Sequence, residues 1–261
     1  MASLVQMEEF RRANERVAEL ARRDLEAFFG TLDLTRPELA RDTLLEFVPV
    51  LTQQYGDLAA SVAAEWFDEL RAEAKVRGRF RALPAEAVSV AQAQATVRWS
   101  ASYLFTEAPS GMLAPLSGAV VKMVLEPSRN TVIDMTARDP RGVGWQRNAR
   151  PTACDFCIML AGRGGVYRSE RSATFGAHGH CYCTASPSWD ANAPEVPTRC
   201  YEASERMQKV RNRAADPSDP KKQAKAQRVL DNHRSNVNSY LKDMKPELDD
   251  YRAELTQALA A

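Results

Sequence analysis

The cysteines and histidines of this chain lie mostly in one short stretch, which constrains its fold more than any other feature. Four of its five cysteines and two of its three histidines fall between residues 154 and 183. Cys154 and Cys157 form a C-x-x-C pair, and His178, Cys181 and Cys183 follow as H-x-x-C-x-C. Two thiolates separated by two residues can hold one ion from a tight turn, so the spacing predicts a tetrahedral metal site.

The exact ligand set stays open at the level of the sequence. A structural zinc ion takes four nitrogen or sulfur ligands, and the stretch offers six when His180 is included. We expect the C-x-x-C pair to bind together with two or three of His178, Cys181 and Cys183. His180 is the weakest candidate because it is crowded against Cys181. Such a site can contribute folding free energy on the order of 10 kcal/mol to a module with few apolar residues.

Three other interpretations of the cluster remain: a reduced thiol cluster without metal, a redox-active C-x-x-C, and a disulfide framework. No βαβ pattern surrounds the pair, which disfavours the redox interpretation. Charged residues interrupt the first dozen positions, so we expect no secretory signal and a reducing compartment, where disulfides are rare. No apolar run approaches the roughly 20 residues of a membrane-spanning helix.

Catalytic motifs are missing from the sequence, and we expect the protein not to be an enzyme. The chain has no H-E-x-x-H, no H-x-E of the nucleobase deaminases, no P-loop, no G-x-S-x-G and no dinucleotide fingerprint. A catalytic zinc would also need an open coordination position and a nearby general base.

The rest of the chain is dominated by helical patterns, and the predicted fold class is mainly α. Apolar residues recur every three or four positions over residues 5–29, ended by Gly30. A second helix is expected from a capping box at Thr35 and Glu38, and Gly56 and Asp57 separate it from a third. Two more helices are predicted, over about 84–105 and 112–125. We expect a helical N-terminal domain (1–125), a small loop-rich α+β zinc-type module (126–197) and an extended, polar helical C-terminal arm (198–261).

Charge offers a further clue to partners. The net charge is only +1, so any nucleic-acid contact must come from a local patch. Residues 138–171 carry seven arginines against three acidic residues, and residues 199–228 carry nine basic residues against four acidic ones. Both stretches can contact DNA phosphates without reading sequence.

The run "DPRGVGWQRNARPTACDFCIMLAGRGGVYRS" followed by "FGAHGHCYCTASPSW" resembles the MuF-like minor capsid proteins of tailed bacteriophages, particularly those from phages of actinobacteria. The resemblance is specific over about residues 139–189. The family's C-x-x-C and H-x-x-C-x-C elements map onto five residues of this chain, and so favour His178 over His180: Cys154, Cys157, His178, Cys181 and Cys183.

The resemblance implies a structural protein of the phage head, packaged inside the capsid near the portal and assisting head assembly or genome packaging and delivery. Its implied partners are the portal protein, other head proteins and packaged double-stranded DNA, with no membrane and no small-molecule substrate. Its location would be the host cytoplasm during assembly and the virion afterwards. The alternative function is that of a zinc-module DNA-binding protein acting in phage DNA packaging or regulation.

Overall fold

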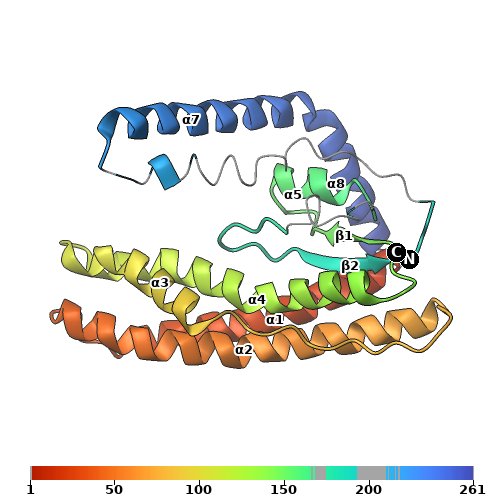
Figure 1. The fold of residues 1–261 in the computed structure, drawn as a ribbon, viewed down its shortest axis with the longest axis horizontal. Coiled ribbons are helices and arrows are strands. Elements are labelled where there is room, and N and C mark those ends of the chain that lie inside the picture. Colours follow the sequence, from red (N-terminus) through yellow and green to blue (C-terminus); the bar gives the residue numbers. More distant parts are fainter. Residues whose placement is uncertain are drawn as a thin grey trace.

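The computed structural model describes residues 2–165, 167, 175–192, 210, 212–214, 216 and 218–260, without the side chains of 233–237, 239, 240 and 243. The fold is mainly helical, as the sequence predicts, with one small two-stranded sheet. Figure 1 shows three layers: a bundle of long helices, a small sheet laid on it, and the last helices on the far side of the sheet. None of the helices in the described part of the chain is long and apolar enough to span a membrane.

Three long helices form the bundle: α1 (Leu4–Phe29), α2 (Pro37–Glu73) and α4 (Leu113–Arg138). Ser3 caps α1 by accepting a hydrogen bond from the Gln6 N–H, and Gly30 ends this helix as the sequence predicts. The apolar stripes of the three helices face one another and bury a continuous core that includes Leu25, Leu44 and Val120. Separate buried clusters, which include Phe67 and Val132, continue the packing toward the other end of the bundle.

Two sequence predictions about α2 are wrong. Thr35 does not cap the helix, because its hydroxyl and N–H bind the Asp33 carboxylate instead. Gly56 does not break the helix: it is buried in the middle of α2, and an added Cβ would come within 3.1 Å of the Ala87 Cβ and 3.3 Å of the Pro127 Cγ. Glycine is therefore needed here for the close approach of two neighbouring segments.

The next helical segment is shorter than predicted. Residues 84–89 form no helix; α3 (Val90–Ser100) starts after Ser89, whose hydroxyl accepts a hydrogen bond from the Gln92 N–H. Two short 3₁₀ helices, η1 (Ala101–Phe105) and η2 (Pro109–Met112), lead into α4. The cap at Ser89 fixes a start that periodicity alone places too early.

The predicted end, near residue 125, of the helix that starts near residue 112 is also wrong. α4 runs through Pro127 to Arg138, so the expected boundary between residues 125 and 126 falls inside a helix. Pro127 removes one helical hydrogen bond, but the residues after it, including Val132 and Met135, stay buried against α1 and α2. Burial of this second half outweighs the local cost of the proline.

The small sheet pairs β1 (Gly144–Asn148) with β2 (Thr184–Ser188) in antiparallel register, Gly144 opposite Ser188. All positions of both strands are buried, because one face lies on the bundle and the other is covered by α5 (Asp155–Ala161) and its neighbours. Trp145 of β1 and Ala185 of β2 pack with Phe10 and Val132 of the bundle. The predicted loop-rich module is thus built on α4.

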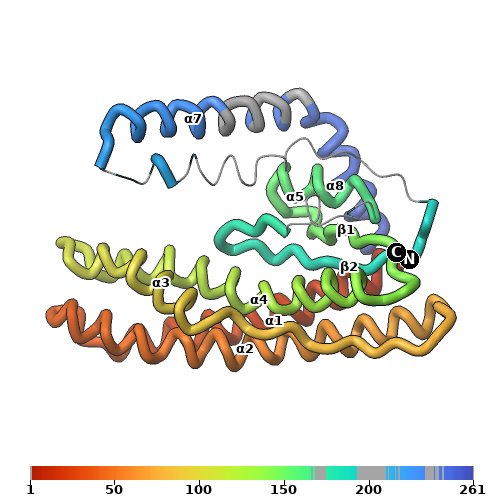
Figure 2. The backbone as a smooth tube through the Cα atoms, viewed as in Figure 1, coloured from red at the N-terminus to blue at the C-terminus, as the bar shows by residue number. Residues whose placement is uncertain are grey.

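The C-terminal arm consists of α7 (Pro220–Asp243) and α8 (Lys245–Ala260). Figure 2 shows α7 running alongside the bundle at a distance and the chain then turning back through α8 toward the sheet. α8 packs on α5, where Leu248 and Leu255 are buried with Ile158 and Leu160. The helix expected over 201–215 and Cys200 fall mostly or wholly outside the described residues.

Candidate metal centre

The two halves of the cysteine motif approach each other because the sheet and α5 bring them together. Cys154 is the N-cap residue of α5, and Cys157 lies in the first turn of that helix. Cys181 and Cys183 come directly before β2, which pairs with β1 just upstream of the C-x-x-C. Strand pairing therefore places segments that are more than twenty residues apart in sequence side by side.

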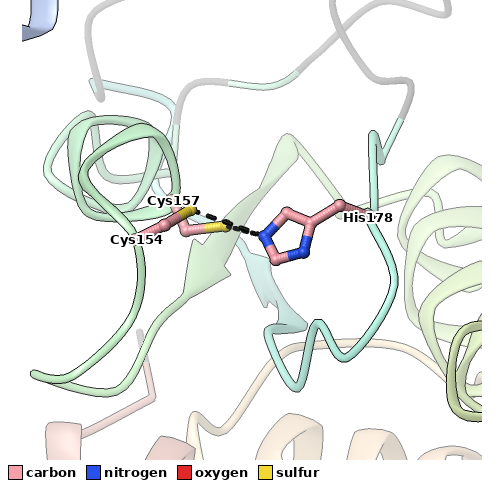
Figure 3. A group of neighbouring side chains, drawn as sticks. All are labelled: Cys154, Cys157 and His178. Carbon is pink, nitrogen blue, oxygen red and sulfur yellow. Dashed lines mark hydrogen bonds between the residues drawn. The ribbon is translucent and has the colours of Figure 1, made fainter. Parts of the chain in front are cut away.

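All five predicted ligands converge around Cys157. The donor atoms of Cys154, Cys157 and His178 lie within 4.8 Å of one another, and so do those of Cys157, Cys181 and Cys183. The Nε2 atom of His178 is 3.5 Å from the Cys154 Sγ and 3.9 Å from the Cys157 Sγ. Figure 3 shows the imidazole directed at the two sulfurs. Cys157, Cys181 and Cys183 are buried and Cys154 is exposed, so the cluster opens to solvent at the beginning of α5.

The two histidines of the stretch have different surroundings. His178 donates a hydrogen bond from Nδ1 to the Gly179 carbonyl at 2.7 Å, which leaves Nε2 directed at the sulfurs. This is the arrangement by which proteins orient an imidazole ligand. His180 adopts φ 58° and packs its ring on Gly118 of α4, where an added Cβ would come within 2.9 Å of Nε2. The structure therefore brings His178, and not His180, to the cysteines.

Contacts among the thiols raise the pKa of some cysteines and lower the pKa of others. Hydrogen bonds to Cys154, Cys181 and Cys183 raise the pKa of Cys157, the sulfur at the centre. Its hydrogen bond to Cys154 lowers the pKa of that exposed thiol to about 5. The hydrogen bond with Cys157 also lowers the pKa of Cys181. At Cys183 the hydrogen bond with Cys157 lowers the pKa, but Cys181 and burial outweigh this effect and raise the pKa to about 11. Thiolate, the form that binds metal, is thus favoured at Cys154 and Cys181.

Arg129 lies under the cluster and was not among the predicted site residues. It projects from α4, is 2% exposed, and donates from Nε to the Cys183 carbonyl at 2.9 Å and from Nη2 to the Cys181 carbonyl at 2.5 Å. Burial lowers the pKa of Arg129, while the Cys181 sulfur raises it. No sequence pattern identifies this residue, because it lies more than fifty positions from the cysteines that it contacts.

A second arginine, Arg147 of β1, also contacts the cluster. Its Nη1 lies 3.6 Å from the Cys157 Sγ, its Nη2 donates to the Gly176 carbonyl at 2.9 Å, and its guanidinium stacks over the Phe175 ring. Arg150 forms an ion pair with Glu15. These two arginines belong to the stretch predicted to contact DNA, and both make contacts with other residues of the protein.

The donor set fits a metal ion. No disulfide joins the four cysteines that the structure describes. Four sulfurs and one imidazole nitrogen, mostly buried and flanked by two guanidinium groups, provide the soft ligands and the positive surroundings that suit a metal–thiolate complex. The cluster can therefore hold a metal, whose binding by these residues would join α5 to the segment before β2.

No curated protein and no solved structure matches the chain. The family model described as VG15 protein matches residues 1–210, which include the bundle, the sheet and all five converging donors. Because this match covers most of the chain, the protein belongs to the VG15 protein family, a family of phage or viral proteins.

Proposed function

We propose that the protein is a non-enzymatic minor capsid protein of a tailed phage, located inside the head near the portal, where it assists head assembly and genome packaging or delivery. The observation that carries the proposal is the convergence of the C-x-x-C and H-x-x-C-x-C elements, on which the resemblance to MuF-like proteins rests, in one cluster. Membership of a phage family supports the same assignment.

In this proposal the cluster holds a structural zinc ion. Zinc matches the donors, since it binds cysteine and histidine in closed four-ligand sites. The ligands would come from Cys154, Cys157, His178, Cys181 and Cys183, and the ion would supply folding free energy to a module whose strands are only five residues long. Helix α4 of the bundle supports the cluster through the two hydrogen bonds of Arg129.

The bundle also offers a surface to a protein partner. Trp99, Tyr103 and Phe105 lie on α3 and η1 and are 66%, 45% and 53% exposed. Aromatic side chains contribute strongly to protein interfaces and are costly to leave in water. We propose that this aromatic surface contacts the portal or another head protein.

The test is to look for the protein in mature virions by mass spectrometry and to measure its co-sedimentation with portal assemblies. The proposal requires both, and it requires weaker co-sedimentation for Trp99→Ala with Phe105→Ala. Leu20→Ala with Leu58→Ala, which alters exposed leucines elsewhere on the bundle, is the matched control. Absence from virions, or no co-sedimentation with portal assemblies, would refute the proposal.

A second candidate function, a zinc-module DNA-binding protein acting in packaging or regulation, is favoured by the first turns of α7. Lys221, Lys225 and Arg228 are exposed at spacings of four and three, which places them on one helix face. Replacing all three with glutamine should weaken salt-dependent binding to duplex DNA. Unchanged affinity in this variant would count against the second function.

A further inference from the structure

A separate set of cations gathers where α2 and α4 end. Figure 1 shows these two helix ends at the same end of the bundle. The segment after α2 holds four cations and no acidic residue over positions 75–81, and two more cations lie at and just beyond the end of α4. We name this surface the basic corner. Its six exposed residues are Lys75, Arg77, Arg79, Arg81, Arg138 and Arg141.

The arginines after α2 point outward because alternate residues between them point inward. Phe80 packs against Phe67 in a buried cluster, and Ala82 is only 4% exposed. In an extended segment, neighbours in sequence face opposite sides, and residues two apart on one side are about 6.5 Å apart. Arg79 and Arg81 are therefore exposed to solvent on the side opposite Phe80 and Ala82.

A buried ion pair holds both parts of the basic corner in place. Arg71 and Asp139 pair at 2.8 Å, with side chains 8% and 0% exposed. The same Arg71 guanidinium donates to the Gly78 carbonyl at 2.8 Å and to the Arg77 carbonyl at 3.3 Å, and Asp139 accepts from the Arg141 N–H at 3.0 Å. The backbone is thus fixed without using any of the six exposed cations.

These six cations have no acidic partners among the residues that the structure describes. None of them forms an ion pair with a residue that the structure describes, in contrast to Arg12, Arg22 and Arg41, which pair with carboxylates on their own helices. Paired arginines carry little external field, whereas unpaired ones attract anions from solution. The basic corner is therefore a preorganised site for an extended anion.

We propose that the basic corner binds the phosphate backbone of double-stranded DNA. Five of the six cations are arginines, whose planar forks suit phosphate oxygens. The segment after α2 exposes guanidinium groups and buries the apolar side chains between them, whereas a protein interface needs an apolar centre. The ligand is that of the second candidate function, but the site is distinct, because neither α7 nor the cysteine cluster takes part.

The experiment measures binding of the full-length protein to a short mixed-sequence duplex by fluorescence anisotropy between about 50 and 200 mM salt. Replacing Arg77, Arg79 and Arg81 with glutamine should weaken binding and reduce the slope of log K against log salt by about 2.7, which is 0.9 for each phosphate contact. Replacing Arg138 and Arg141 should reduce it by about 1.8. Circular dichroism verifies that both variants keep the helical fold.

Three further binding measurements distinguish this site from the alternatives. Glutamine at Arg12, Arg22 and Arg41 changes the net charge equally and should leave the slope unaltered; an equal loss there would overturn the inference in favour of overall charge. Loss confined to the α7 variant would overturn it and support the second candidate function alone. Binding of polyglutamate as tight as that of the duplex would overturn the assignment to nucleic acid, as would no binding by the wild type.

Discussion

Arg129 is the residue on which the charge balance of the cysteine cluster depends. Any four of the five donors include at least three cysteines, so a zinc complex built from them has a net charge of −1 or −2. Arg129 supplies a buried positive charge directly beneath these ligands and forms no ion pair with a described carboxylate. Its two hydrogen bonds also fix the carbonyls of Cys181 and Cys183, and with them the direction of the two sulfurs.

Replacing Arg129 with methionine should therefore lower zinc affinity by about 10- to 100-fold, the range found for residues that support metal ligands. The measurement is competition with a chromogenic chelator. Arg41→Met is the control, because Arg41 lies on α2 and pairs with its neighbour Asp42. Arg129→Lys keeps the charge and should bind better than Arg129→Met; equal affinities for wild type and Arg129→Met would contradict this role.

The Asp139 carboxylate makes the stability of the fold depend on pH in the acidic range. Burial raises the pKa of this carboxyl, but hydrogen bonds from Arg71 and Trp189 and from the Arg141 N–H outweigh burial and hold it below its ordinary value. A depressed pKa in the folded state means that the stabilisation is present above the unfolded pKa of about 3.9 and is lost as pH falls through the folded value.

We thus expect the free energy of unfolding to fall below about pH 4, and to fall less steeply in Asp139→Asn, which has no carboxyl to protonate. Urea unfolding at several pH values measures this. Asp42→Asn, at an exposed residue paired only with its neighbour Arg41, is the control and should keep the wild-type pH profile. The same profile in Asp139→Asn as in the wild type would show that this carboxyl does not carry the acid sensitivity.

At the scale of elements, α8 is attached to α5 by both apolar and polar contacts. Leu248 and Leu255 are buried against α5, and Arg252 donates to the Ala153 carbonyl and to the Asp155 carboxylate. Ala153 and Asp155 flank Cys154, so the last helix of the chain supports the C-x-x-C turn. A polar helix that could not be stable alone gains stability from this contact.

Leu248→Ala should destabilise the protein by about 2–5 kcal/mol, the usual cost of removing a buried leucine side chain. Urea unfolding followed by circular dichroism checks this value. Leu20→Ala, at a residue that is 44% exposed on α1, is the control and should cost much less. If both changes cost the same, the packing of α8 on α5 contributes no special stability.

At the scale of the whole molecule, the cysteine cluster and the bundle share one helix. α4 provides core residues on the side that faces α1 and α2, and Arg129 on the side that faces the cysteines. Loss of metal should therefore be felt in the helical core as well as in the small module. Because contacts on both sides stabilise α4, we expect the bundle and the small module to unfold together.

Protein produced in a reducing cytoplasm should contain one equivalent of zinc by elemental analysis, and Cys157→Ser should contain none. Chelation should lower the midpoint of thermal unfolding of the wild type, because metal binding contributes folding free energy on the order of 10 kcal/mol in such sites. The midpoint of Cys157→Ser should not respond to chelator. A wild-type protein without metal and without a chelator effect would exclude the zinc site.

The sequence by itself determined the helical class and the long apolar stripes, and it offered six candidate metal donors in one short stretch, because helix periodicity and ligand spacing are local properties of the chain. It could not show that α2 continues through Gly56 or that α4 continues through Pro127, since burial against distant helices outweighs a local breaker at both positions. Only the tertiary structure placed Arg129 beneath the cysteines, turned Arg147 inward and left the basic corner unpaired. Whether an arginine faces a thiolate, a carboxylate or the solvent depends on contacts between segments far apart in sequence.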